Sequence, residues 1–206
     1  MSNKANDADN QQATLQIEGE SSETICQAPL SRLEILAYLN GALHDASLNK
    51  RKRIRFVQKY QEWLKTLQNL LKNLGYNSWI YKEGKNRNLY VLETLCKELD
   101  FKFNPLSLKS EKGKSAYLRG FFDAEGGVPR KLGRFYIQLA QKDYGKIVIV
   151  KKLLNDLKIA TGIIHNPSKK IDPNYWRVSV LTKDYRNFAK VVGSWHPIKA
   201  KILNKG

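Results

Sequence analysis

Two acidic side chains stand at the end of a predicted helix, beside a pair of glycines. In the stretch SAYLRGFFDAEGGV, residues 115–128, Asp123 and Glu125 come directly before Gly126 and Gly127. A glycine pair is a stop signal for a helix, so the two carboxylates are expected at its carboxyl end. Carboxylate oxygens suit hard divalent cations, and Mg²⁺ is the expected one. The stretch therefore predicts part of a metal site.

The same helix carries small residues along one face. Ala116, Gly120 and Ala124 recur every four residues, so they lie on one side of the helix. Small side chains allow two helix backbones to approach closely. A second helix packed against this face would bring its own carboxyl end, and any acid there, next to Glu125.

The nine residues LRGFFDAEG, at 118–126, resemble the LAGLIDADG motif of homing endonucleases. The resemblance implies that Glu125, in place of the motif's last aspartate, coordinates a metal, while Asp123 packs or caps at the base of the helix. Taken alone, such a nonamer is also compatible with a buried helix that ends at a glycine. The residues that match the motif as they stand are Leu118, Gly120, Asp123, Ala124 and Gly126.

The chain repeats this helix and the segments that follow it. AYLNG at 37–41 recurs as AYLRG at 116–120. Two further pairs of landmarks follow in the same order, at an offset that is only slightly larger. Landmarks in one order at a nearly constant spacing indicate a tandem duplication. These further pairs are 55–59 with 138–142 and 70–74 with 153–157.

We predict a flexible N-terminal tail at 1–30, a first half at 31–110 and a second half at 111–206. Apolar alternation and helical spacing give both halves one order of elements, αββαββα. The expected helices are 31–44, 60–74 and 93–100, then 114–125, 143–158 and 183–192; the expected strand segments are 50–57 and 78–92, then 134–140 and 162–181.

That order is the order of a LAGLIDADG half, so the resemblance covers nearly the whole chain after residue 30. It implies an α+β fold with two pseudo-twofold halves that pack through their small-residue helices. Antiparallel sheets would form a saddle over DNA, with the other helices behind them. Each central helix would offer one carboxylate to a shared site, where divalent cations can activate water and stabilise the leaving oxygen.

The first half leaves the identity of its acid open. Aligning Gly41 with Gly120 puts Ala46, not an acid, opposite Glu125, and Asp45 falls one residue short. A one-residue slip near Asn40 would instead match Asp45 with Glu125. The family often has an Asp-Gly-Ser-like run after this helix, which favours the slip and makes Asp45 the second metal ligand. Otherwise Asp45 only caps the helix, and this copy has lost its acid.

Further catalytic candidates come from the resemblance. Gln58 and Gln141 recur in both halves, each after a strand-like run and before a lysine. In the family a polar residue near this position orders water around the metals; a solvated strand end is the alternative. The family takes a phosphate-neutralising base from the segment that closes each half. The candidates there are Lys102 or Lys109 in the first half and Lys199, which we prefer, or Lys201 in the second.

The charge distribution indicates a polyanionic partner. The formal net charge is +17, and residues 1–25 contribute five acids and one base, so the remainder carries 35 bases against 14 acids. A body this basic repels itself unless a polyanion binds it. The sequence contains no secretory signal, no apolar run long enough to span a membrane and no zinc-ligand spacing. An intracellular setting is expected, with no membrane partner.

Basic and polar side chains on the strands and loops are the expected DNA contacts. Alternation puts Ile54 and Phe56 on one face of a strand and the arginines on the other. Arginine and glutamine suit contacts to guanine and adenine, and lysine more often meets phosphate. The candidates are Arg51, Arg53, Arg55, Lys82, Lys85, Arg87, Arg130, Arg134, Gln138, Lys169, Lys170 and Arg177.

Together these features predict a site-specific homing endonuclease that makes a double-strand break in a long, asymmetric DNA target, using Mg²⁺ or another divalent cation. Because the chain holds both halves, it is expected to act as a monomer. Two alternatives share the fold: an intron maturase that binds RNA, and a DNA-binding relative that does not cut. The sequence alone does not separate them.

Overall fold

The computed structural model describes residues 30–50, 52–129 and 134–205. The tail predicted at 1–30 lies almost wholly outside the described residues, and so do the DNA-contact candidates Arg51 and Arg130.

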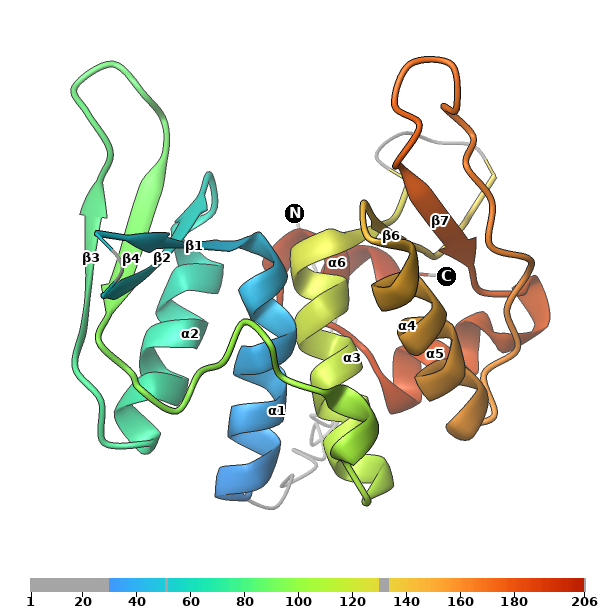
Figure 1. Cartoon of the computed structure of the whole chain (residues 1–206), viewed down its shortest axis with the longest axis horizontal. Helices are drawn as coiled ribbons and strands as arrows, with labels where there is room; N and C mark the ends of the chain where they lie inside the picture. Colours follow the sequence, from blue (N-terminus) through green and yellow to red (C-terminus); the bar gives the residue numbers. More distant parts are fainter. Residues whose placement is uncertain (1–29, 51, 130–133, 206) are drawn as a thin grey trace, which may run out of the picture.

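Two helices lie side by side at the centre of the molecule, with a sheet and further helices on either side of them (Figure 1). They are α1 (Arg32–Ala42), which continues into a 3₁₀ turn, η1 (Leu43–Asp45), and α3 (Glu111–Glu125). The first begins at a capping box, in which Ser31 and Glu34 each accept a hydrogen bond from the other's backbone amide.

Glycine brings the two central helices into backbone contact. A Cβ on Gly41 would overlap the carbonyl oxygen of Tyr117 and lie 2.8 Å from the amide nitrogen of Phe121. A Cβ on Gly120 would overlap the carbonyl oxygen of Tyr38 and lie 2.9 Å from the amide nitrogen of Ala42. The close approach expected from the small-residue face is therefore present, and it is symmetric.

The first sheet has four antiparallel strands in the order β1-β2-β4-β3. Ile54 and Phe56 of β2 are buried, whereas Arg53 and Arg55 lie on the other face, as the alternation predicted. Helix α2 (Gln61–Asn73) packs its apolar face into the core. The strands are β1 (Ala46–Asn49), β2 (Arg53–Gln58), β3 (Ser78–Lys82) and β4 (Tyr90–Thr94).

The second sheet is shorter, with three antiparallel strands in the order β5-β6-β7. Its fourth strand is reduced to two isolated bridges, Thr161 with Val180 and His165 with Arg177. Arg134 precedes the strand that we expected it to begin. The elements of this half are β5 (Gly126–Gly127), β6 (Gln138–Gln141), α4 (Tyr144–Asp156), β7 (Trp176–Ser179), η3 (Thr182–Asp184), α5 (Tyr185–Val191) and α6 (Pro197–Leu203).

The prediction of a helix at 93–100 is wrong. Glu93 and Thr94 are the last residues of β4 and pair with both β2 and β3. The side chain of Glu93 is bound by donors from neighbouring strands, and the Thr94 hydroxyl donates to the carbonyl of Asn77 at 3.0 Å. These long-range bonds outweigh the helix propensity of LETLCKEL, and the first half closes with only a 3₁₀ turn, η2 (Pro105–Ser107).

The predicted α+β fold, with two pseudo-twofold halves packed through their central helices, is confirmed. Within the described ranges, none of the helices has the length and apolar character needed to cross a membrane.

Candidate active site

The sheet registers place Asp45 and Glu125 at equivalent positions. Ala46, directly after Asp45, pairs with Phe56, and Gly126, directly after Glu125, pairs with Leu139. Phe56 and Leu139 are themselves counterparts in the paired landmarks 55–59 and 138–142. Each carboxylate therefore occupies the last position before the first strand of its half.

The one-residue slip lies in η1 rather than near Asn40. Five residues lead from Gly41 to the strand at Ala46, and six lead from Gly120 to the strand at Gly126. The first half covers the distance with a 3₁₀ turn, which rises further per residue than an α-helix. The second half stays α-helical to Glu125. Asp45, not Ala46, is therefore the structural counterpart of Glu125.

Asp45 lies close enough to Glu125 for its charge to affect the ionisation of Glu125. Burial, and then the negative charge of Asp45, raise the pKa of Glu125 to about 7. Burial raises the pKa of Asp45 to about 6, although the Gln58 hydrogen bond and the charge of Lys199 oppose the rise. Like charges that share a partly desolvated site favour a bound cation or a retained proton.

The two recurring glutamines have different partners. Gln58 donates its amide N–H to the Asp45 carboxylate and so fixes it directly. Gln141 lies 3.1 Å from Nδ1 of His44, the residue next to Asp45. Gln58 is the last residue of β2 and Gln141 the last residue of β6, but of the two only Gln58 bonds to one of the paired acids.

Lys199 contacts the end of α3. Its Nζ donates to the carbonyl oxygens of Phe122 and Asp123, each at 2.7 Å. The Phe122 carbonyl also accepts the backbone N–H of Gly126, the residue that caps the helix. Pro197 begins α6 and so presents the lysine to this site. In the first half, the described chain has the short turn η2 where the second half has α6. Lys102, which comes just before that turn, lines a cavity beside the site.

Two tyrosine pairs, which the sequence reasoning missed, join the central helices. The Tyr38 hydroxyl donates to Asp123 at 2.6 Å. Tyr117, its counterpart in the AYLRG copy of the repeat, has its hydroxyl 3.0 Å from Nε2 of His44. His44 thus occupies the position that Asp123 holds in the other half. The repeat could have identified both pairs, because it aligns the two tyrosines and, at the same offset, their partners.

Asp123 is buried and structural. It accepts hydrogen bonds from Tyr38, from the Ser194 hydroxyl and, at 3.0 Å, from the Trp195 amide. Burial nevertheless raises its pKa. The arrangement fits the packing role that the resemblance implied for this position.

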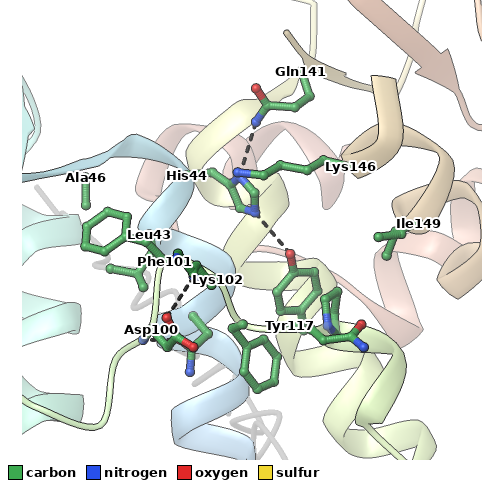
Figure 2. A pocket seen from close by; sticks show the side chains of 14 residues that line it. Leu43, His44, Ala46, Asp100, Phe101, Lys102, Tyr117, Gln141, Lys146 and Ile149 are labelled. Atoms are coloured by element: carbon green, nitrogen blue, oxygen red, sulfur yellow. Dashed lines mark hydrogen bonds between the residues drawn. The ribbon is translucent and has the colours of Figure 1, made fainter. Parts of the chain in front are cut away.

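A cavity of about 420 Å³ flanks the site on the side of His44 (Figure 2). Figure 2 shows His44 bonded to Gln141 on one side and to Tyr117 on the other. Burial lowers the pKa of His44 to about 4, so the ring is neutral at physiological pH. The cavity's wall also includes Lys102 and Lys146.

The DNA-contact candidates are spread over both sheets and their loops. Arg53 and Arg55 lie on the outer face of the first sheet, with Arg177 and Gln138 on the second. Several are paired with acids: Arg53 with Glu93, and Arg55 and Arg87 with Glu83. Lys82 ends β3, and Lys85, Lys169 and Lys170 lie in loops.

The donor set fits a hard divalent cation. Among the residues that the structure describes, no group of three or more histidine, cysteine or acidic side chains could hold a metal. Asp45 and Glu125 supply two carboxylates with raised pKa values, which a cation would keep ionised. Such a site leaves room for water and phosphate oxygens, which Mg²⁺ retains or recruits.

Residues 30–101 and 112–193 each match the family model described as a LAGLIDADG-like domain. The chain belongs to the LAGLIDADG-like family. The two matched segments are the two structural halves, so the duplication inferred from the repeat is confirmed. No curated protein matches the chain.

Solved structures share the fold. A structure of I-DmoI in complex with DNA and Mn is 21% identical, with a TM-score of 0.59, and the match covers 79% of this chain and 98% of that one. The N-terminal LAGLIDADG domain of DUF199/WhiA is 20% identical, with a TM-score of 0.63, over 79% of this chain and 82% of that one. Full-length DUF199/WhiA from Thermatoga maritima is 20% identical, with a TM-score of 0.64, and the match covers 86% of this chain and 62% of that one.

Proposed function

We propose that this LAGLIDADG-like protein is a site-specific DNA endonuclease of the homing type, which makes a double-strand break near the centre of a long, asymmetric target. The meeting of Asp45 and Glu125 at the ends of the paired helices carries the proposal. The basic body supports a DNA partner. I-DmoI, a homing endonuclease with the same fold, has been solved with DNA and Mn and with DNA and Ca.

Asp45 and Glu125 would hold the divalent cation, Mg²⁺ being the expected one. When bound, the cation would supply an activated water and stabilise charge on the scissile phosphate. Gln58 fixes the Asp45 carboxylate through its hydrogen bond. Lys199 holds the end of α3 and lies near both carboxylates, so its charge is placed to offset negative charge that develops on the phosphate.

Cleavage of supercoiled plasmids that carry a library of randomised sites tests this proposal. The proteins are wild type, Asp45→Asn, Glu125→Gln and Ala46→Asp, each with Mg²⁺ or with EDTA. Glu62→Gln, at an exposed position of α2, is the charge-matched control. Wild type and Glu62→Gln should cut a defined site with Mg²⁺ alone. Asp45→Asn and Glu125→Gln should bind that site and cut it at least about 100-fold more slowly, because a bound metal contributes several kcal/mol to such a reaction.

A non-cutting DNA-binding protein is the second candidate. The first half favours it, because His44 stands where the other half has Asp123, and a short turn stands where the other half has α6 and Lys199. Wild type that binds a defined site without cutting would support this candidate. Restoration of cutting by Ala46→Asp would place the first acid at 46 and contradict the role given to Asp45.

A maturase-like role predicts a different outcome in a competition between RNA and DNA for binding. An RNA-binding splicing cofactor would prefer folded RNA to duplex DNA. Competition with a structured RNA of matched length should leave DNA binding unchanged if the endonuclease proposal holds. Displacement of the DNA at equimolar RNA would favour the maturase role.

A further inference from the structure

The outer face of the first sheet has a buried carboxylate at its centre. Glu93 of β4 lies opposite Arg55 of β2 and Trp79 of β3, so the three side chains share one face of the sheet. Trp79 on this face is 37% exposed, whereas Glu93 is 2% exposed. An acid so well covered is unusual on a surface that should approach a polyanion.

Donors from three strands enclose Glu93. Asn49 Nδ2, Arg53 Nη1 and the Tyr81 hydroxyl donate to its carboxylate oxygens at 3.1, 3.2 and 3.2 Å, and Arg55 Nε lies 3.9 Å away. Burial alone would raise the pKa of Glu93, but the bonds from Asn49, Tyr81 and Arg53 outweigh burial and lower it. We call Asn49, Arg53, Arg55, Tyr81 and Glu93 the Glu93 network.

The network fixes two of the arginines expected to contact DNA. The Arg53 guanidinium bonds Glu93 and lies over the Trp79 ring, 5.7 Å from its centroid. Arg55 lies between Glu93 and a second acid, Glu83. A guanidinium has five N–H donors, and the Arg53 side chain is half exposed, so donors remain for an incoming base.

The second sheet has no equivalent of this acid among its described residues. Arg177 on β7 lies over the ring of Tyr175, 5.4 Å from its centroid, and in the described part of the chain it forms no ion pair. The halves therefore share a fold but treat their arginines differently. The first half combines positive charge with a negative centre, and the second does not.

We propose that Glu93 determines specificity in the first half, by holding Arg53 and Arg55 toward base edges and by offsetting their attraction to phosphate. Arginine reads guanine through two hydrogen bonds of fixed geometry, which a pre-positioned guanidinium makes without losing further side-chain freedom. The buried charge of Glu93 also weakens the general pull of this face on the backbone of any DNA. The ligand is a guanine-containing half-site, and the inference rests on the proposed DNA-binding function.

Selection of bound duplexes from a randomised pool, in EDTA so that no cutting occurs, tests the inference. Glu93→Gln should lower base preference at first-half positions roughly 10-fold and leave second-half positions unchanged. Its affinity for non-specific duplex should rise, and the plot of log affinity against log salt should steepen by about one phosphate contact. Glu62→Gln, with the same charge change on α2, should leave base preference as in the wild type.

Arg53→Lys is a second variant. It keeps the positive charge of this half-exposed side chain but removes the planar guanidinium that can make two parallel hydrogen bonds. It should lose the part of the first-half base preference that Arg53 provides, and adding Glu93→Gln to it should remove only the remaining part that depends on Arg55. Unchanged first-half preference in either single variant would overturn the inference while DNA binding stands. Equal loss at both half-sites would also overturn it, since the Glu93 network touches only the first half. Failure of the wild type to bind any duplex would overturn the proposed function as well.

Discussion

At the residue scale, the site combines carboxylates and imidazoles whose ionisation is shifted in opposite directions. Burial raises the pKa of Asp45 to about 6 and, with the Asp45 charge, that of Glu125 to about 7. Burial lowers to about 4 the pKa values of His44, next to Asp45, and of His196, a buried residue directly before α6. Because their pKa values are raised in the folded state, the two acids make the protein less stable as the pH rises toward those values. The two histidines, whose pKa values are lowered, make the protein more stable as the pH rises from about 4 to about 6.5. The two contributions oppose each other across this range.

Removing the acids should expose this compensation. In EDTA, the double variant Asp45→Asn/Glu125→Gln should become more stable than the wild type as pH rises from about 4.5 to 7. The gain should be on the order of 2–3 kcal/mol after allowance for the water that reaches the site. Urea unfolding at a series of pH values measures it. A difference that does not change with pH would contradict the raised pKa values.

Divalent metal should make the wild type more stable than the double variant. Mg²⁺ binds the ionised carboxylates of the folded state and should raise the melting temperature of the wild type but not of the double variant. Calorimetry with Mg²⁺ and with EDTA makes the comparison. Equal stabilisation of both proteins would place the metal elsewhere.

Lys199 is the basic side chain whose contacts tie it to the site. Lys199→Met removes its two bonds to the end of α3 and a positive charge near the phosphate, so we expect slower cleavage by about 100-fold and a loss of about 1 kcal/mol in stability. Lys201→Met, on the same helix but exposed, is the matched control. Single-turnover cleavage and urea unfolding measure the two effects. If both variants slow cleavage equally, only the general charge of α6 matters.

At the element scale, the central helices determine where the carboxylates meet. Their backbones touch at Gly41 and Gly120, and the Tyr38–Asp123 and Tyr117–His44 pairs cross between them. One helix ends in a 3₁₀ turn and the other stays α-helical, yet the two ends present their acids at matching positions. Helix packing, rather than the length of either helix, sets the geometry of the site.

Methyl groups at the helix crossing should separate the helices. A Cβ at Gly41 or Gly120 would meet backbone atoms, which cannot move aside as a flexible side chain can. Either alanine variant should lose at least about 2–4 kcal/mol of stability, and cleavage should fall with the misplaced acids. Gly145→Ala, in helix α4 with only the Asp143 carboxylate 3.2 Å away, should be neutral or slightly stabilising. Denaturant unfolding measures the loss of stability in each variant. A Gly41→Ala protein as stable as the wild type would argue against close packing of the two helices.

At the scale of the whole molecule, charge and asymmetry define the expected target. The chain carries a formal net charge of +17, and its two sheets differ in strand number and in the partners of their arginines. Two unlike halves in one chain should contact two unlike half-sites. A single copy should then cover the whole site.

DNA binding should therefore be strongly dependent on salt and have a 1:1 stoichiometry. If six to ten phosphates are contacted, affinity should fall about 10³- to 10⁵-fold between about 50 and 200 mM salt. Fluorescence anisotropy across this range gives the slope, and sedimentation of the complex gives the stoichiometry. A two-to-one complex on one site would contradict the monomer proposal.

Local patterns in the sequence were sufficient to predict the duplication and the order of elements in each half, because repeat spacing, strand alternation and helix-face patterns survive in both. The way the two halves pack came from the resemblance to the LAGLIDADG family. The small-residue face, the capping box at Ser31 and Glu34 and the candidate acids were all readable from short stretches. The same patterns left two candidates, Asp45 and Ala46, for the first-half position equivalent to Glu125.

The choice between those two residues required the folded chain, because the 3₁₀ turn that shifts Asp45 into place is set by helix packing and sheet register together. The same holds for β4, where cross-strand bonds to Glu93 and Thr94 replaced a helix that local propensity favoured. The contacts of Lys199 with α3 and of Glu93 with Arg53 join residues that are far apart in the sequence. Such pairs leave no periodic trace in a sequence, so they appear only when the chain is folded.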